Sequence, residues 1–294
     1  MTKTTFRIGE LEVTRIEEIG VVPVPPEAFL ADPPLESFER ARHLMAPEWF
    51  DPVTGDVLMS LHSWMVRTPH HIVLIDTCGG NHKERPDTPW LHQLDTPWLD
   101  RLVGCGIAPE QVDYVMCTHL HADHVGWNTR LIDGRWVPTF PNARYLFSPK
   151  EYEHWRAAAE STEAWGQQGV FEDSVLPCME AGLVSFVDDG HVVDDSLQVE
   201  SAIGHTVANT IIRASSSGST GLFLGDCIHT PIQTLYPDIN TRACELPGEA
   251  RATRRRLLSD AAEHGHLIIP AHFPAPHFGR VTARGDAFAF HPGL

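Results

Sequence analysis

The amino-acid sequence predicts an α/β (α+β) protein in which helices cover β-sheets, folded as a single domain over residues 1–294. Short apolar, β-branched runs alternate along the chain with segments of helical character. The 294 residues are 42% hydrophobic and 21% charged, which is an ordinary globular composition. No repeat of fixed period and no linker rich in Gly or Ser divides the chain. These observations favour one layered domain.

The apolar runs and the helical segments place the individual elements. Strands are expected at residues 12–16, 57–66, 72–75, 112–117, 144–147, 197–202, 210–214, 221–224 and 267–269. Helices are expected at residues 90–102, 150–158, 172–181 and 249–264. The last helix has an arginine-rich face, for which a solvated surface is the favoured interpretation over an anion site: Arg251, Arg254, Arg255 and Arg256.

The most irregular stretch, residues 20–56, combines seven prolines, among them Pro23, Pro25, Pro26, Pro33 and Pro34, with many large apolar side chains. Such a segment must pack against the core or a ligand, and we interpret it as a substrate cap. The candidate pocket residues in and beyond it are Phe29, Trp49, Phe50, Trp64, Phe273 and His277. Each aromatic taken alone is expected to be ordinary core. Only the segment as a whole indicates an apolar pocket wall.

Charge and targeting signals narrow the function classes. Lys and Arg total 22 against 39 Asp and Glu, a formal net charge of −17, which argues against nucleic-acid binding. The first residues have no apolar stretch of signal-peptide length, and no window is long and apolar enough to cross a bilayer. We therefore expect a cytoplasmic protein without a membrane partner. The six cysteines are scattered without a CxxC pair, which favours reduced thiols.

One short segment carries four potential metal ligands. His119, His121, Asp123 and His124 follow the strand-like run 112–117. Residues two apart in extended backbone point to one side, so His119 and His121 can share an ion while Asp123 and His124 reach a second position. Imidazole and carboxylate are the ligands that zinc and comparable first-row ions use. A polar loop that happens to be rich in His is the alternative, but this spacing rarely arises by accident.

Further polar residues stand where other apolar runs end. His205, Asp226 and His272 each follow such a run, and so does Asp76, which we expect just behind the ligands. Strands of one sheet that end at the same edge would gather these side chains in a single cleft.

Seven ligands suit two divalent ions, with Zn as the expected metal and Mn, Fe or Co as alternatives. His119, His121 and His205 would hold the first ion, and Asp123, His124 and His272 the second. Asp226 would bridge the two ions. A shared water would become a hydroxide nucleophile at neutral pH, so neither a Ser nor a Cys nucleophile is needed.

The motif His119-Leu120-His121-Ala122-Asp123-His124 resembles the HxHxDH motif of the metallo-β-lactamase superfamily. Gly204-His205-Thr206, Gly225-Asp226 and His272 match its remaining metal motifs in order. The resemblance implies a four-layer αββα sandwich with the metals at one edge of the sheets. It also implies the dinuclear hydrolase branch, in which Asp76, Thr118 and Thr206 support the ligands.

Within that branch the chain is similar to the lactonase and methyl parathion hydrolase group. The similarity rests on Asp76-Thr77-Cys78-Gly79-Gly80-Asn81, on Trp127-Asn128-Thr129 and on residues 134–143. Val207-Ala208-Asn209 stands where many relatives have Pro-Gly-His, so altered loop packing is expected there. His229 occupies the position of the catalytic tyrosine of acyl-homoserine lactonases. His229 could hydrogen-bond the substrate carbonyl or protonate the leaving oxygen, or it could be a bystander at the pocket rim.

The predicted function is hydrolysis of a lactone or carboxylic ester with an apolar body, with Asp123, Asp226 and His229 taking part in catalysis. The alternative within hydrolases is aryl ester or phosphotriester cleavage. From another class, an iron-dependent redox enzyme of the same fold would use similar ligands. The expected partner is a small-molecule substrate, and the resemblance adds the possibility of a homodimer.

Overall fold

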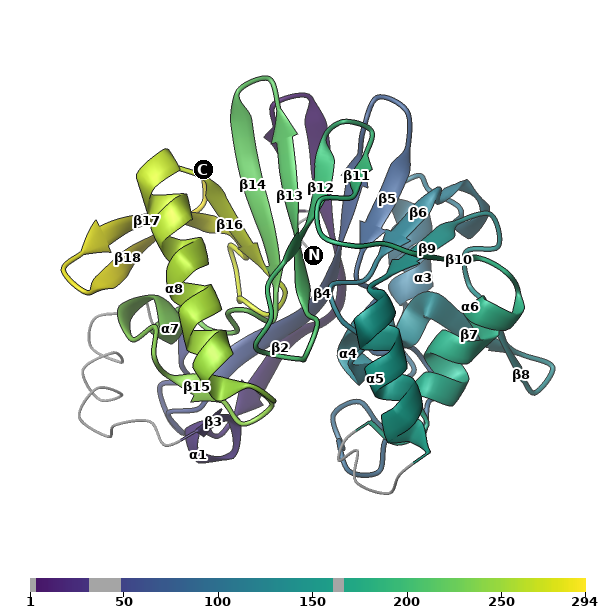
Figure 1. Ribbon diagram of the computed structural model, residues 1–294. Helices are drawn as coiled ribbons and strands as arrows, with labels where there is room; N and C mark the ends of the chain where they lie inside the picture. The colour runs from purple at the N-terminus through teal and green to yellow at the C-terminus, as the bar shows by residue number, and fades with distance from the viewer. Residues whose placement is uncertain (1–3, 32–48, 161–166) are drawn as a thin grey trace.

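The computed structural model of the protein describes residues 4–31, 49–160 and 167–294. In these ranges two large sheets stand face to face, with helices on both outer sides (Figure 1). One sheet has the order β1 (Thr5–Ile8), β2 (Leu11–Val24), β4 (Val57–Arg67), β5 (Ile72–Ile75), β6 (Tyr114–Met116), β9 (Arg144–Phe147) and β10 (Val184–Phe186). The other has the order β11 (Val192–Val193), β12 (Leu197–Ser201), β13 (Thr210–Ser216), β14 (Ser219–Gly225), β16 (Leu267–Pro270), β17 (Gly279–Arg284) and β18 (Ala287–Pro292).

Three apolar clusters hold the layers together. The central cluster joins the sheets, with Trp64 and Val73 from the first sheet against Ile212 and Phe223 from the second. The outer face of the first sheet is covered by α3 (Trp98–Gly104), α5 (Pro149–Ala159) and α6 (Leu176–Glu180). The outer face of the second sheet is covered by α8 (Pro247–His264). These layers confirm the αββα sandwich that the resemblance implied.

Parallel strand pairs bring the ends of distant segments to one edge. Strand β5 pairs parallel with β6, and β14 pairs parallel with β16. Each of these strands therefore ends toward the same side, where α4 (Ala122–Val125) and α7 (Ile232–Leu235) follow (Figure 1). Because polar residues directly follow these strands, the sheet architecture itself gathers them at this edge.

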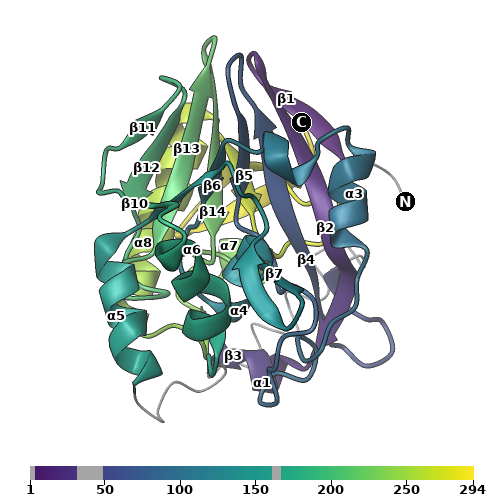
Figure 2. The same ribbon diagram turned by 90° about the vertical axis from the view of Figure 1, so that its right-hand side faces the viewer.

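The described parts of the predicted cap lie at the same end of the molecule. Helix α1 (Pro26–Phe29) leads into β3 (Leu30–Ala31) at the lower end of the view in Figure 2, and β3 pairs with β15 (Asn240–Thr241). Trp49 and Phe50 pack with Leu30, Met59 and residues of α7 in one buried cluster. Residues 32–48 of the predicted cap lie outside the described residues.

Several sequence-based element predictions need correction. Strands at 72–75 and 144–147 are confirmed, but the helix predicted at 90–102 begins only at Trp98 and continues to Gly104. Pro97 stands directly before α3, and its missing N–H disfavours a continuous helix through that position. The predicted helix 172–181 is divided into a π-helical turn, Phe171–Val175, and α6. A β-hairpin of β7 (Thr129–Ile132) and β8 (Arg135–Pro138) was not predicted, and neither was the β17–β18 hairpin.

The expectation of a solvated arginine face on α8 is wrong for Arg254. Its side chain is buried and donates hydrogen bonds to the carbonyl oxygens of Cys227, Pro237 and Ile239 and to Asn240 Oδ1. The guanidinium group is thus satisfied by neutral acceptors on the chain that leads into β15.

Among the helices of the described ranges, none is both long enough and apolar enough to cross a lipid bilayer.

Candidate metal centre and adjoining pocket

The seven predicted ligands converge in two groups at the common edge of the sheets. In each group the potential ligand atoms lie within 4.8 Å of one another. The first group is His119, His121, His205 and Asp226, and the second is Asp123, His124 and His272. All of these side chains are buried except Asp123, which is half-buried. Apart from Asp226, which falls in the first group, the two groups contain the residues that the sequence analysis assigned to each ion.

The local backbone explains how one short segment serves both groups. After β6 the chain bends at Thr118 and His119 and is extended again at His121, whose φ is −72° and ψ is 159°. Helix α4 begins at the next residue, so Asp123 and His124 leave on a different side from the two preceding histidines. This change of backbone conformation turns the side chains of Asp123 and His124 away from those of His119 and His121.

Asp226 stands between the two groups. Its Oδ1 lies 3.1 Å from His124 Nε2 and 3.1 Å from His272 Nε2. Its Oδ2 lies 3.2 Å from His205 Nε2 and 3.8 Å from His119 Nε2. One carboxylate oxygen therefore faces each group, which is the arrangement that a bridging ligand needs.

The donor set fits divalent cations. The buried atoms His119 Nε2, His124 Nε2 and Asp226 Oδ1 have no hydrogen-bond partner in the described part of the chain. Buried polar atoms without partners are costly and rare. Each of these three atoms can offer a lone pair to a cation. Two ions would therefore satisfy the orphaned atoms.

The pKa shifts of the histidines in the cluster also favour bound cations. Burial and neighbouring imidazoles lower the pKa of His119 well below its usual value, which keeps its ring neutral and able to coordinate. Although burial alone would lower the pKa of His124, Asp226, Asp123 and Asp76 raise it well above normal. Positive charge is therefore favoured between these carboxylates, where the second group lies.

Of the three residues predicted to support the ligands, Asp76 and Thr118 contact them directly, through His124 and His119 respectively. Asp76 Oδ2 accepts hydrogen bonds from His124 Nδ1 at 2.9 Å and from Thr118 Oγ1 at 2.8 Å. Since His124 Nδ1 donates to Asp76, His124 Nε2 keeps the lone pair that faces Asp226. On the other side, Thr206 Oγ1 donates to Glu151 Oε2 at 2.8 Å.

Two buried glutamates of the site were not found from the sequence. Glu151 accepts hydrogen bonds from Leu120 N–H and Trp155 Nε1–H as well as Thr206, and so joins the loops of His119 and His205. Glu18 accepts hydrogen bonds from Gly79 N–H at 2.6 Å and from Trp127 Nε1–H at 2.6 Å. Glu18 thereby joins the loop after Asp76 to the chain that follows the ligand motif. Both glutamates lie on elements far from the ligand motif in the sequence. An acidic residue in a sequence does not by itself show that its side chain is buried.

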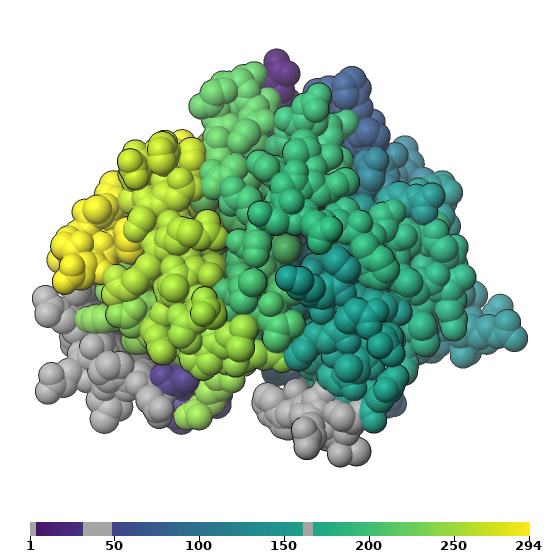
Figure 3. All heavy atoms as spheres, in the orientation of Figure 1, coloured from purple at the N-terminus to yellow at the C-terminus, as the bar shows by residue number. Residues whose placement is uncertain are grey.

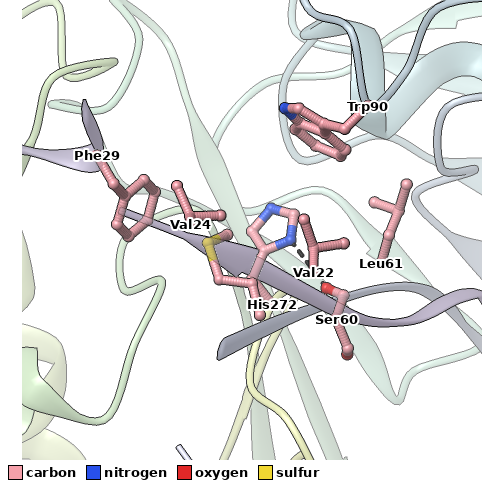
Figure 4. A pocket seen from close by; sticks show the side chains of 8 residues that line it. Val22, Val24, Phe29, Ser60, Leu61, Trp90 and His272 are labelled. Atoms are coloured by element: carbon pink, nitrogen blue, oxygen red, sulfur yellow. Dashed lines mark hydrogen bonds between the residues drawn. The ribbon is translucent and has the colours of Figure 1, made fainter. Parts of the chain in front are cut away.

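An apolar hollow adjoins the second ligand group. Together with the solvent at its mouth it has about 360 Å³ of empty space, and it is lined by Val22, Val24, Phe29, Met59, Ser60, Leu61, Trp90 and His272. His272 forms one wall, while Phe29 and Trp90 stand on opposite sides of it (Figure 4). His272 Nδ1 donates to the Ser60 carbonyl oxygen at 3.2 Å, which leaves Nε2 for the metal centre.

Of the predicted pocket residues, Phe29 lines this hollow and the others lie elsewhere. Trp64 packs between the sheets, 5.7 Å from Phe6 in ring-centroid distance. Trp49 and Phe50 belong to the buried cluster behind Met59. Phe273 belongs to the core beneath α8, and His277 Nδ1 donates to the Phe273 carbonyl oxygen at 2.7 Å. Trp90, which was assigned to a helix, was missed.

His229 lies inside the centre rather than at its rim. Its Nε2 is 3.1 Å from Asp226 Oδ2, and its ring stacks on His272 at a centroid distance of 5.8 Å. Its Nδ1 is buried and has no partner in the described residues. Burial lowers the pKa of His229 to about 4. A neutral ring whose Nε2–H donates to Asp226 carries a lone pair on Nδ1.

Comparison with known families and structures accounts for this arrangement. The model of the metallo-β-lactamase superfamily matches residues 59–272, which is more than half of the chain. The chain belongs to the metallo-β-lactamase superfamily. Family membership bears out the predicted enzyme class, a metal-dependent hydrolase. No curated protein matches the sequence.

Solved structures share the fold at low sequence identity. AbOPH, a hydrolase in the β-lactamase superfamily, is 23% identical with a TM-score of 0.82, over 99% of this chain and 97% of AbOPH. AidC, a dizinc quorum-quenching lactonase, is 19% identical with a TM-score of 0.80, over 99% of this chain and 97% of AidC. A probable metal-dependent hydrolase from Staphylococcus aureus is 16% identical with a TM-score of 0.75, over 98% of this chain and 100% of that one.

Proposed function

We propose that this protein is a dinuclear metal hydrolase that opens lactones, or cleaves carboxylic esters, with an apolar body. The observation that carries the proposal is that the apolar hollow and the candidate metal centre share one residue. His272 belongs to the second ligand group and at the same time forms a wall of the apolar hollow. A substrate whose apolar body fills the hollow would therefore hold its polar end beside the metal centre.

In this proposal His119, His121 and His205 would hold one ion, Asp123, His124 and His272 would hold the other, and the two oxygens of Asp226 would serve both. When bound, two divalent ions, with zinc as the first choice, would supply a nucleophile from water at neutral pH and polarise the substrate's carbonyl oxygen. Asp76 fixes the ring of His124, and the Ser60 carbonyl oxygen fixes the ring of His272. These contacts keep both Nε2 lone pairs directed at the centre.

His229 is proposed to move a proton. Its Nε2–H donates to Asp226, so its Nδ1 can accept a proton from the attacking water and return it to the leaving oxygen. The proposal is supported by the Phe29 ring, which lines the hollow and makes an edge-to-face contact with the His229 imidazole at a centroid distance of 5.6 Å.

Replacing His229 with phenylalanine is expected to lower kcat by about 10²-fold, because a general acid–base group contributes on the order of 10²–10⁴. His229→Gln, which retains a donor for Asp226 but cannot transfer a proton, should not restore kcat. Metal content, measured on the same samples, should stay at the wild-type level. Full turnover by His229→Phe would make the residue a bystander.

A second candidate, aryl ester or phosphotriester hydrolysis, is favoured by one feature of the hollow. The aromatic side chains of Phe29 and Trp90 stand on its two sides (Figure 4), and an aromatic lining suits a flat aryl group as well as an acyl chain. The metal centre proposed above can serve either substrate class.

Substitution in the hollow tests whether it receives the apolar body of the substrate. Val22→Asn is expected to raise KM for a long-chain acyl lactone about tenfold, because loss of one buried aliphatic contact costs about 1–2 kcal/mol. KM for a short-chain lactone should change little. The matched control is Val21→Asn on the same strand, where the side chain is 57% exposed and outside the hollow. Equal KM changes in both variants would contradict a role for the hollow.

A further inference from the structure

We propose that the C-terminal end of α8 carries a third metal site, separate from the catalytic centre, formed by Asp260, His264 and His266. One potential ligand atom from each residue lies within 4.8 Å of those from the other two. This set uses no residue of the centre described above. The proposed ligand is a borderline divalent ion such as Zn²⁺ or Cu²⁺.

The fold brings the three side chains together through a helix end. Asp260 and His264 are four residues apart on α8, so they lie on one face of the helix. The helix ends at His264, and Gly265 adopts the left-handed conformation with φ +66°. That reversal returns the chain toward β16 and stacks His266 on His264, with ring centroids 5.3 Å apart and an interplanar angle of 17°. A side chain at position 265 would be strained, so the glycine helps to fix the arrangement.

Both carboxylate oxygens of Asp260 already have partners, so a cation would have to compete for one of them. Its Oδ1 lies 3.0 Å from His264 Nδ1, and its Oδ2 accepts a hydrogen bond from Arg213 Nη2 at 2.8 Å. Arg213 also pairs with Glu200, whose Oε1 is 2.7 Å from Nε. A bound ion would therefore displace Arg213 from Asp260 without leaving the guanidinium group unpaired. Because that displacement opposes binding, the site should be weaker than the catalytic centre.

The donor chemistry and exposure indicate the class of ion. Two imidazoles and one carboxylate suit zinc, copper or nickel rather than calcium or magnesium. The His264 side chain is 54% exposed, so water can complete the coordination and the ion can exchange. Helix α8 lies at the surface (Figure 3), and its 18 residues separate this corner by roughly 25 Å from its other end, beside the His205 loop. Binding should consequently stabilise the α8–β16 corner and leave kcat unchanged.

The test uses the full-length protein already loaded with zinc at its strong sites. Titration with Cu²⁺, followed by electron paramagnetic resonance, should show a further ion with nitrogen couplings from two imidazoles. His264→Ala and His266→Ala should each weaken this binding about tenfold or more and remove one nitrogen coupling. Arg213→Gln should tighten binding, because the competing cation is gone. His191→Ala, an exposed histidine outside the cluster, is the matched control.

The outcomes separate the proposal from its alternatives. Binding that is unchanged in the two histidine variants, or equally reduced in His191→Ala, would overturn the site. Arg213→Gln supplies an independent arm, since a variant that binds no tighter than wild type contradicts displacement at Asp260. The readout is binding and spectroscopy rather than turnover, so its result does not depend on the proposed hydrolase activity.

Discussion

Asp226→Asn is expected to abolish hydrolysis and to lower the zinc content of the purified protein. The Asp226 carboxylate is the group that faces both ligand sets, with one oxygen 3.1 Å from His124 Nε2 and the other 3.2 Å from His205 Nε2. Asparagine removes the negative charge and one of the two acceptor oxygens. Loss of several kcal/mol of transition-state stabilisation corresponds to a fall in kcat/KM of roughly 10³-fold or more.

The measurement pairs kcat/KM with zinc per chain determined by elemental analysis. The matched control is Asp238→Asn, since Asp238 is an exposed carboxylate paired with Arg255 at 2.6 Å and lies outside the centre. That variant should keep wild-type activity and zinc content. Two ions per chain and normal turnover in Asp226→Asn would rule out a bridging role for this residue.

The largest effect on stability is expected for Glu18→Ala. The Glu18 carboxylate accepts hydrogen bonds from Gly79 and Gly80 N–H, Trp127 Nε1–H and Thr96 Oγ1–H. Each buried donor left unpaired costs on the order of 1–3 kcal/mol, so the free energy of unfolding should fall by about 3 kcal/mol or more. Gly126 packs directly on Gly79, so loosening this contact should also disturb the ligand motif and reduce activity.

Urea unfolding at saturating zinc measures the change. The control is Glu12→Ala on the same strand, where the carboxylate is partly exposed and lies 3.7 Å from Arg7 Nη2. An exposed pair of this kind contributes at most about 1 kcal/mol. If Glu18→Ala were no less stable than Glu12→Ala, the buried carboxylate would not be what joins the two loops.

The candidate metal ligands could be predicted best from the sequence, because they are either closely spaced in one motif or placed directly after a predicted strand. His119 to His124 are close in the chain, and His205, Asp226 and His272 each follow an apolar strand. Sheet geometry then brings the ends of those strands together. All seven candidate ligands could therefore be selected without coordinates, and the structure places them in two groups.

The pocket could not be read in the same way. Strand β4 is buried on both faces, so alternation along it does not say which side chains face the hollow. Met59 lines the hollow, whereas Trp64 of the same strand turns into the core between the sheets. Trp90 comes from a proline-rich loop whose path no periodicity predicts. The roles of Glu18 and Glu151 depend on hydrogen bonds to backbone groups more than twenty residues away, and a single sequence does not reveal such contacts.

Proton release at constant pH tests the central claim most directly. The zinc-loaded protein is compared on an apolar acyl lactone, an aryl carboxylic ester and an aryl phosphotriester, each before and after removal of metal by chelation. We expect the highest kcat/KM on the lactone, with all three activities lost on chelation and recovered with zinc. A highest kcat/KM on the phosphotriester would transfer the assignment to the second candidate, and full activity in the metal-free protein would contradict a metal-dependent hydrolase.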